Sequence, residues 1–197
     1  MNSLPQLRAL IELRPNCSGR DLNDASLRSL LCYDIDEMRQ NGFDPSTIDY
    51  HEQFNERMEI FISHSQIGAY LRHLTTKDGI EASGIGLMPL ESIKPSVGEG
   101  CGPGGFIFPF GYLPIGGSVG GNALCVHSPS GEVGWADHEG FSDDSVNYRD
   151  VATGDWRSVE LTEENIKKGI IPLSSNLESF LHDLLNDRLR SRLVVLS

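Results

Sequence analysis

Four side chains that lie close together in the sequence could, by their types, carry out hydrolysis or hold a metal ion: Cys125, His127, Asp137 and His138. Thiolates, imidazoles and carboxylates attack carbonyls, activate nucleophiles or ligate zinc. Cys125 and His127 would share one face of a strand, but no third group orients the histidine as a base. Neither an H-E-x-x-H nor a G-x-S-x-G motif is present. We therefore expect no catalytic residue, metal ion or cofactor, and expect His127 to be a half-buried strand residue with a hydrogen bond.

Two glycine patterns could indicate a nucleotide-binding loop, Gly84–Gly86 and Gly116–Gly121. A dinucleotide-binding loop must open a helix, because the helix N-terminus meets the pyrophosphate. The second pattern is instead followed by Asn122–Val126, which has the composition of a strand. No phosphate-binding loop motif is present either. The sequence therefore predicts a glycine-rich connection between strands.

The elements that would position these side chains begin with a helical front. Apolar residues recur at helical spacing from Leu4 until Pro15 ends the run, and a second helix is predicted from about Asn23 until Asn41-Gly42 ends it. A third is predicted over 49–74, with a break around 63–68.

The middle of the chain changes to short apolar runs between glycines and prolines. Strands are predicted over Ile85–Leu90, Gly105–Phe110, Ala123–His127 and Val133–Ala136, and Ser128–Gly131 is predicted to join the last two as a hairpin. A closing amphipathic helix is predicted to follow a cap at Ser174 or Ser175 and to run to about Leu185. The fold class indicated is α+β, a central antiparallel sheet with helices packed before and after it.

Charge is the strongest compositional feature, since 28 acidic residues oppose 16 basic ones and leave a net charge of −12. Such a surface repels phosphate backbones, so we expect no nucleic-acid partner, and it attracts basic proteins. Between residues 132 and 164, ten acidic residues and two arginines leave −8. The acids are Glu132, Asp137, Glu139, Asp143, Asp144, Asp150, Asp155, Glu160, Glu163 and Glu164. We interpret 140–155 as a polar loop, and charge gathered on a loop favours recognition.

The remaining composition suggests a protein of the cytoplasm. No apolar stretch is long enough for a membrane span, the first residues do not form a signal peptide, and the four cysteines are expected as free thiols. Trp135 is predicted to lie in the core, whereas Trp156, inside the acidic segment, could contact a partner.

Several runs, in this order, resemble the SUKH superfamily, which includes fungal cell-wall-synthesis regulators. They are Leu87–Ile93 (LMPLESI), Phe106–Tyr112 (FIFPFGY), Gly120–Val126 (GGNALCV), Gly131–Glu139 (GEVGWADHE) and Ser174–Leu185 (SSNLESFLHDLL). The resemblance covers about 84–188. The proline-containing helix that usually opens the family is not matched, because Ile67–Gly79 lacks the proline. The resemblance thus implies a SUKH-like α+β domain over 49–197, with 1–48 as a helical extension of one globular unit.

The resemblance implies a binding role without catalysis. Bacterial members serve as immunity proteins that neutralise polymorphic toxins, often nucleases, and fungal members are regulatory interaction proteins. Nuclease toxins need basic surfaces, which an acidic binder could occupy. We therefore expect an immunity protein with a basic toxin domain as its partner. The partner-binding residues expected are Asp137, Glu139, Asp143, Asp144, Asp155 and Trp156. The alternatives are a regulatory scaffold without a toxin partner and a small metal-dependent hydrolase.

Overall fold

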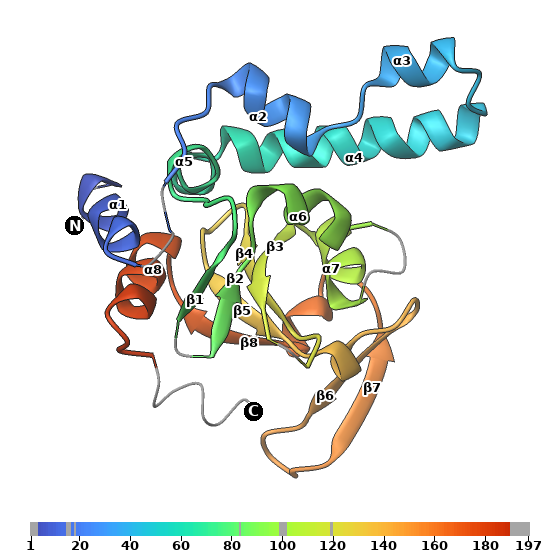
Figure 1. The fold of residues 1–197 in the computed structure, drawn as a ribbon. Coiled ribbons are helices and arrows are strands. Elements are labelled where there is room, and N and C mark those ends of the chain that lie inside the picture. The colour runs from blue at the N-terminus through green and yellow to red at the C-terminus, as the bar shows by residue number, and fades with distance from the viewer. Residues whose placement is uncertain are drawn as a thin grey trace.

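The structure, a computed structural model of the chain, describes residues 4–14, 17, 19–82, 84–98, 102–118 and 120–189. They form a six-stranded antiparallel sheet surrounded by helices, together with a separate two-stranded sheet (Figure 1). The predicted α+β class with a central antiparallel sheet is confirmed. In the described part of the chain, no helix combines the length and the apolar character needed to cross a bilayer.

The elements follow one another in chain order. The α-helices are α1 (Leu4–Glu12), α2 (Asp24–Leu31), α3 (Ile35–Gln40), α4 (Pro45–Ser63), α5 (Ser65–His73), α6 (Leu90–Ser96), α7 (Gly102–Ile107) and α8 (Leu177–Leu185). The strands are β1 (Ile80–Ala82), β2 (Ile85–Leu87), β3 (Tyr112–Gly117), β4 (Ala123–His127), β5 (Val133–Ala136), β6 (Ser145–Arg149), β7 (Trp156–Glu160) and β8 (Ile170–Ser174). Three 3₁₀ turns are η1 (Phe108–Phe110), η2 (His138–Gly140) and η3 (Ile166–Lys168).

The strand order of the large sheet is β1-β2-β3-β4-β5-β8. Its central strands are covered on both faces. Successive side chains of a strand point to opposite faces. Leu124 and Trp135 accordingly enter one apolar cluster, while Cys125 and Ala136 enter a second. Trp135 is 4% exposed, which confirms its predicted place in the core.

Helices cover the first face of the sheet. Leu7 and Ile11 of α1 and Leu27 and Leu31 of α2 are buried in the same cluster as the inner faces of α4, α5, α6 and α8. Figure 1 shows α1 beside α8 at one edge and α2 lying along α4 and α5. The apolar residues before position 48 and those after it therefore belong to one core.

The second face is covered by α7 and by the small sheet of β6 and β7. Val146 of β6, Phe141 before it and Ile166 of η3 are buried with Cys125 and Ala136 of the large sheet. Burial of these side chains holds the β6–β7 hairpin against the body, while the far end of the hairpin extends away from it (Figure 1).

The predicted glycine-rich connection and the predicted hairpin turn are both confirmed. Gly116 and Gly117 end β3, and Gly120 and Gly121 precede β4, with Gly121 at φ of 88°. The turn between β4 and β5 is closed by the Gly131 N–H, which donates to the carbonyl of His127 at 2.8 Å. Pro15 and Cys101 lie outside the described residues, whereas Cys17, Cys32 and Cys125 are free thiols.

The prediction of a strand over Gly105–Phe110 is wrong, because this segment forms the end of α7 and then η1. Pro109 has no N–H to donate to a strand ladder. The ring of Phe108 packs against two phenylalanine rings of α4, with centroids 5.0 and 5.7 Å apart. Gly111, with φ of 82°, reverses the chain so that β3 begins at Tyr112.

The single helix predicted from Asn23 to Gly42 is also wrong, since the chain forms α2 and α3 with a break between them. The Asn55 amide of α4 satisfies both backbone groups of Tyr33, accepting from its N–H at 2.8 Å and donating to its carbonyl at 2.9 Å. Asp34 then caps α3 by accepting from the Glu37 N–H at 2.9 Å. The predicted break between α4 and α5 is confirmed.

Three other boundaries differ from the predictions. The strand expected over Ile85–Leu90 ends earlier, and its last residue already begins α6. The cap of α8 is Asn176 rather than either preceding serine, and it accepts from the Ser179 N–H at 2.8 Å. The segment 140–155, interpreted as a loop, contains β6, because Val146 and Tyr148 alternate with polar residues and pair with β7.

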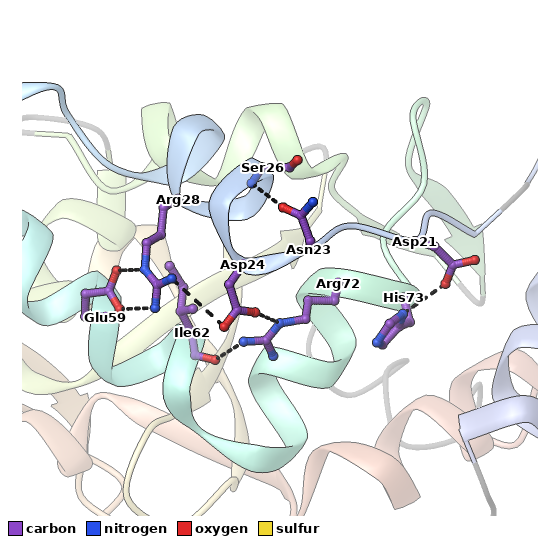
Figure 2. A network of polar contacts seen from close by, with 9 residues as sticks. All are labelled: Asp21, Asn23, Asp24, Ser26, Arg28, Glu59, Ile62, Arg72 and His73. Atoms are coloured by element: carbon purple, nitrogen blue, oxygen red, sulfur yellow. Dashed lines mark hydrogen bonds and ion pairs between the residues drawn. The ribbon is translucent and has the colours of Figure 1, made fainter.

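A polar network joins α2 to α4 and α5 (Figure 2). Arg72 binds Asp24 through Nε at 2.6 Å and donates from Nη2 to the Ile62 carbonyl at 3.0 Å. Arg28 binds Glu59 through Nε at 2.6 Å. Arg72 thus satisfies a carbonyl at the end of α4 and holds the start of α2 beside it.

We predict that Arg72→Met destabilises the fold by about 1–3 kcal/mol, because it removes charged hydrogen bonds while keeping the aliphatic stem. Urea unfolding followed by circular dichroism measures the loss. Arg39→Met is the matched control, since the Arg39 side chain is 53% exposed and its ion pairs with Asp36 and Glu52 lie at the surface; its cost should stay within about 0.5 kcal/mol. Equal losses in the two variants would contradict the bridging role of Arg72.

We also predict that Gly68→Ala is destabilising by about 1–3 kcal/mol, because α5 approaches the end of α4 too closely for a side chain. A Cβ at Gly68 would lie 2.2 Å from the Ile62 carbonyl oxygen. Gly86→Ala is the control, since its Cβ would meet only the Gly117 carbonyl oxygen at 3.8 Å. Thermal unfolding should show a lower Tm for Gly68→Ala alone, and an unchanged Tm there would refute the close packing of the two helices.

Candidate functional site

The β6–β7 hairpin has one face toward the body and one toward solvent. Val146 pairs with Val159 and Tyr148 with Arg157, and the buried Val146 places this set on the inner side. The alternate pairs, Asn147 with Ser158 and Arg149 with Trp156, therefore belong to the outer side.

Trp156 is the most prominent apolar side chain of this outer face. It is 67% exposed, whereas large aromatic side chains usually gain stability from burial. It lines a shallow depression of ≈ 330 Å³ together with Glu139, Asn147, Arg157 and Ser158. An exposed tryptophan beside polar groups is typical of protein-binding surfaces.

The short turn η2 positions Glu139 at this depression. Asp137 caps the turn by accepting from the Glu139 N–H at 2.9 Å, and the Asn122 side chain accepts from the His138 N–H at 2.9 Å. The Glu139 carbonyl also accepts from the Asn147 amide at 3.3 Å. These backbone contacts fix the turn against β6 and leave the Glu139 side chain 78% exposed.

The end of the hairpin nearest the body carries Asp143 and Asp144, both exposed. The Ser142 hydroxyl donates to Asp144 at 3.2 Å, and the Asp144 carbonyl accepts from the Leu161 N–H at 2.8 Å, which brings Glu160 alongside. Among the described residues, the one ion pair that joins a carboxylate of 132–164 to a lysine or arginine lies elsewhere, between Arg157 and Asp150 at 3.6 Å. These carboxylates at the base of the hairpin are therefore uncompensated by ion pairs.

The tip of the hairpin is balanced in charge. Asp150 pairs with Arg157, and Arg149 donates to the Gly154 carbonyl at 2.9 Å beside Asp155. The two aspartates and two arginines of the tip cancel. Val151, which is fully exposed, and Trp156 give this end an apolar character instead.

The structure brings only some of the predicted partner-binding residues together. Glu139 and Trp156 share the depression, and Asp137 holds the turn beneath it. Asp155 is near the tip and its carbonyl accepts from the Asp150 N–H at 2.8 Å. The five residues of β6 lie between Asp144 and Asp150, and Asp150 lies beside Asp155, so Asp144 and Asp155 are about 20 Å apart at roughly 3.3 Å per residue step. The acidic residues thus form a base group and a tip rather than one cluster.

Two lysines just beyond the acidic segment, Lys167 and Lys168, lie in η3. Lys168 Nζ lies 5.7 Å from the centroid of the Tyr148 ring on the inner face of the hairpin. Burial, and secondarily the charge of Lys167, lower the pKa of His127. The charge count over 132–164 does not include these two lysines, which lie three and two residues before the start of β8.

The four residues considered for hydrolysis lie in two places: Cys125 and His127 are on β4, and His138 Nδ1 lies 3.5 Å from Asp137 Oδ1 at η2. Burial raises the pKa of the Cys125 thiol to about 12, and the thiol donates to the Gly134 carbonyl at 3.4 Å. His127 is half-buried, as predicted; its Nδ1 lies 3.0 Å from the Ser130 hydroxyl and its ring stacks on Tyr112. Within the described ranges, no three His, Cys, Asp or Glu residues are grouped so as to hold a metal ion. The thiol therefore has neither a lowered pKa nor a bound base.

Comparison with known proteins assigns no family to the chain. No protein-family model matches it, and neither a curated protein nor a solved structure matches it significantly. The resemblance to the SUKH superfamily stays a prediction that depends on the residue runs alone.

Proposed function

We propose that this chain is a non-catalytic protein-binding domain that contacts a basic partner through its hairpin surface. We define this surface as η2, the following Asp143 and Asp144, and the outer face and tip of β6–β7. The observation that carries the proposal is Trp156, which is 67% exposed on β7, a strand that contacts the core from its opposite side only through the partly buried Val159. The ladder of the hairpin pairs Trp156 with Arg149. Burying the indole ring against a partner would remove a large apolar area from water.

In this proposal the base of the hairpin surface increases the rate of association, and its tip decreases the rate of dissociation. Glu139, Asp143 and Asp144 have no lysine or arginine partner among the described residues, and their charge attracts a basic surface over long range and accelerates encounter. The tip carries Trp156 and Val151 with balanced charges, and buried apolar contacts there slow dissociation. Binding without an apolar anchor would be weak and lost in salt.

The partner proposed is a basic toxin domain, and the role proposed is that of an immunity protein. The net charge of −12 and the resemblance to SUKH proteins support this choice. A nuclease toxin holds phosphates with lysines and arginines, and a carboxylate-bearing surface can cover them. A regulatory protein with a basic partner that is not toxic would use the same surface.

We predict that neutralising the base of the hairpin slows association with a basic toxin domain encoded beside this chain by about tenfold at low salt. The variant carries Glu139→Gln, Asp143→Asn and Asp144→Asn, and stopped-flow fluorescence of Trp156 measures the rate. The matched control carries Glu37→Gln, Asp49→Asn and Glu56→Gln on exposed positions of α3 and α4, with the same change in net charge. Equal slowing by both would show that overall charge, not this surface, attracts the partner.

We further predict that Trp156→Ala increases the dissociation rate by about thirtyfold or more, the effect of losing a central aromatic anchor. Surface plasmon resonance measures it, and circular dichroism should show an unchanged fold because the side chain is exposed. Ile171→Ala is the control, since Ile171 is exposed on β8 outside the hairpin surface. Full protection of cells from the toxin by the Trp156→Ala variant, with unchanged dissociation, would refute the proposed anchor.

A further inference from the structure

A pocket of ≈ 210 Å³ lies where α1, α5 and α8 meet. Leu4 and Leu7 of α1, Leu74 after α5, and Leu177 and Leu181 of α8 line it with apolar surface. The small side chains of Ser65 and Ala69 leave the space between the helices open. In Figure 1 these helices cover the edge of the sheet away from the β6–β7 hairpin, so the pocket is separate from the hairpin surface.

Glu178 gives this apolar pocket a single acidic group. It stands in the first turn of α8 and lines the pocket, and its oxygen Oε1 is buried without a hydrogen-bond partner among the described residues. Buried carboxylate oxygens are normally satisfied, because desolvation without a partner costs free energy. The unpartnered oxygen therefore indicates a donor that the described part of the chain does not supply.

We infer that this pocket binds a small primary amine, with the ammonium group donating to Glu178 and an apolar body lying among the leucines. An ammonium group offers three donors and a charge opposite to that of the carboxylate. A neutral donor would gain less from a carboxylate, and an anion would be repelled by it.

The size of the pocket limits the amine. A cavity of about 150 Å³ lined by aliphatic and aromatic side chains holds a benzene molecule. The pocket of ≈ 210 Å³ therefore has room for a ring of that size with a one-carbon arm and an amino group. Benzylamine has these dimensions and is the probe chosen for the test.

The experiment titrates benzylamine into the full chain and follows it by methyl NMR of Leu7 and Leu181, with toluene and benzoate as comparison ligands. We expect saturable shifts with benzylamine, with toluene binding at least about tenfold more weakly and benzoate not binding. Glu178→Gln should weaken benzylamine at least about tenfold while leaving toluene unchanged. Glu163→Gln, an exposed carboxylate on the segment before η3, is the matched control and should change nothing.

A second variant, Ala69→Phe, fills the space between α5 and α8 and should abolish the binding of both benzylamine and toluene. It tests the site even if Glu178→Gln alters the start of α8. The inference would be overturned if benzylamine caused no saturable shifts of the methyl signals in the unaltered protein. Equal affinity for benzylamine and toluene would overturn it as well. Neither result bears on the hairpin surface, which lies on another part of the molecule.

Discussion

Double-sided burial of β4 and β5 is the constraint on which the structure depends. Every residue of β5 is buried, and in β4 only the last residue is partly exposed. A sheet strand of this kind needs an apolar layer on each face. The helices supply one layer, and α7, η3 and the β6–β7 hairpin supply the other. The position of the hairpin is therefore set by the burial of its apolar side chains against the second face of the sheet.

This constraint explains why the outer face of the hairpin can present an exposed tryptophan. Val146 is fully buried, so the register of β6 against β7 cannot slip by one residue without turning it outward. The same register turns Trp156 toward solvent and brings the Asn147 amide to the Glu139 carbonyl of η2. A recognition surface that is rigid before binding loses less conformational entropy on association.

The sequence predicts those elements whose apolar spacing and end signals agree. The closing helix, the break between α4 and α5, and the β4–β5 hairpin are of this kind. It fails at Gly105–Phe110, where strand-like residues fold as α7 and η1 because Phe108 packs against α4, a contact that local composition does not contain. It also fails at Tyr33, whose backbone is satisfied by the distant Asn55. In both places a tertiary contact overrides local propensity.

The candidate surface, too, could be predicted only in part from the sequence. The acidic segment is visible in the sequence, but the pairing of β6 with β7 decides which carboxylates meet. A second acidic concentration lies between Asp34 and Glu59, where eight acids and two arginines leave −6. Several of these carboxylates already serve the fold: Asp34 and Asp44 cap helices, and Arg28 pairs with Glu59. The carboxylates at the base of the hairpin have no such partners, and this difference, more than the number of charges, distinguishes a surface available for binding from one that stabilises helices.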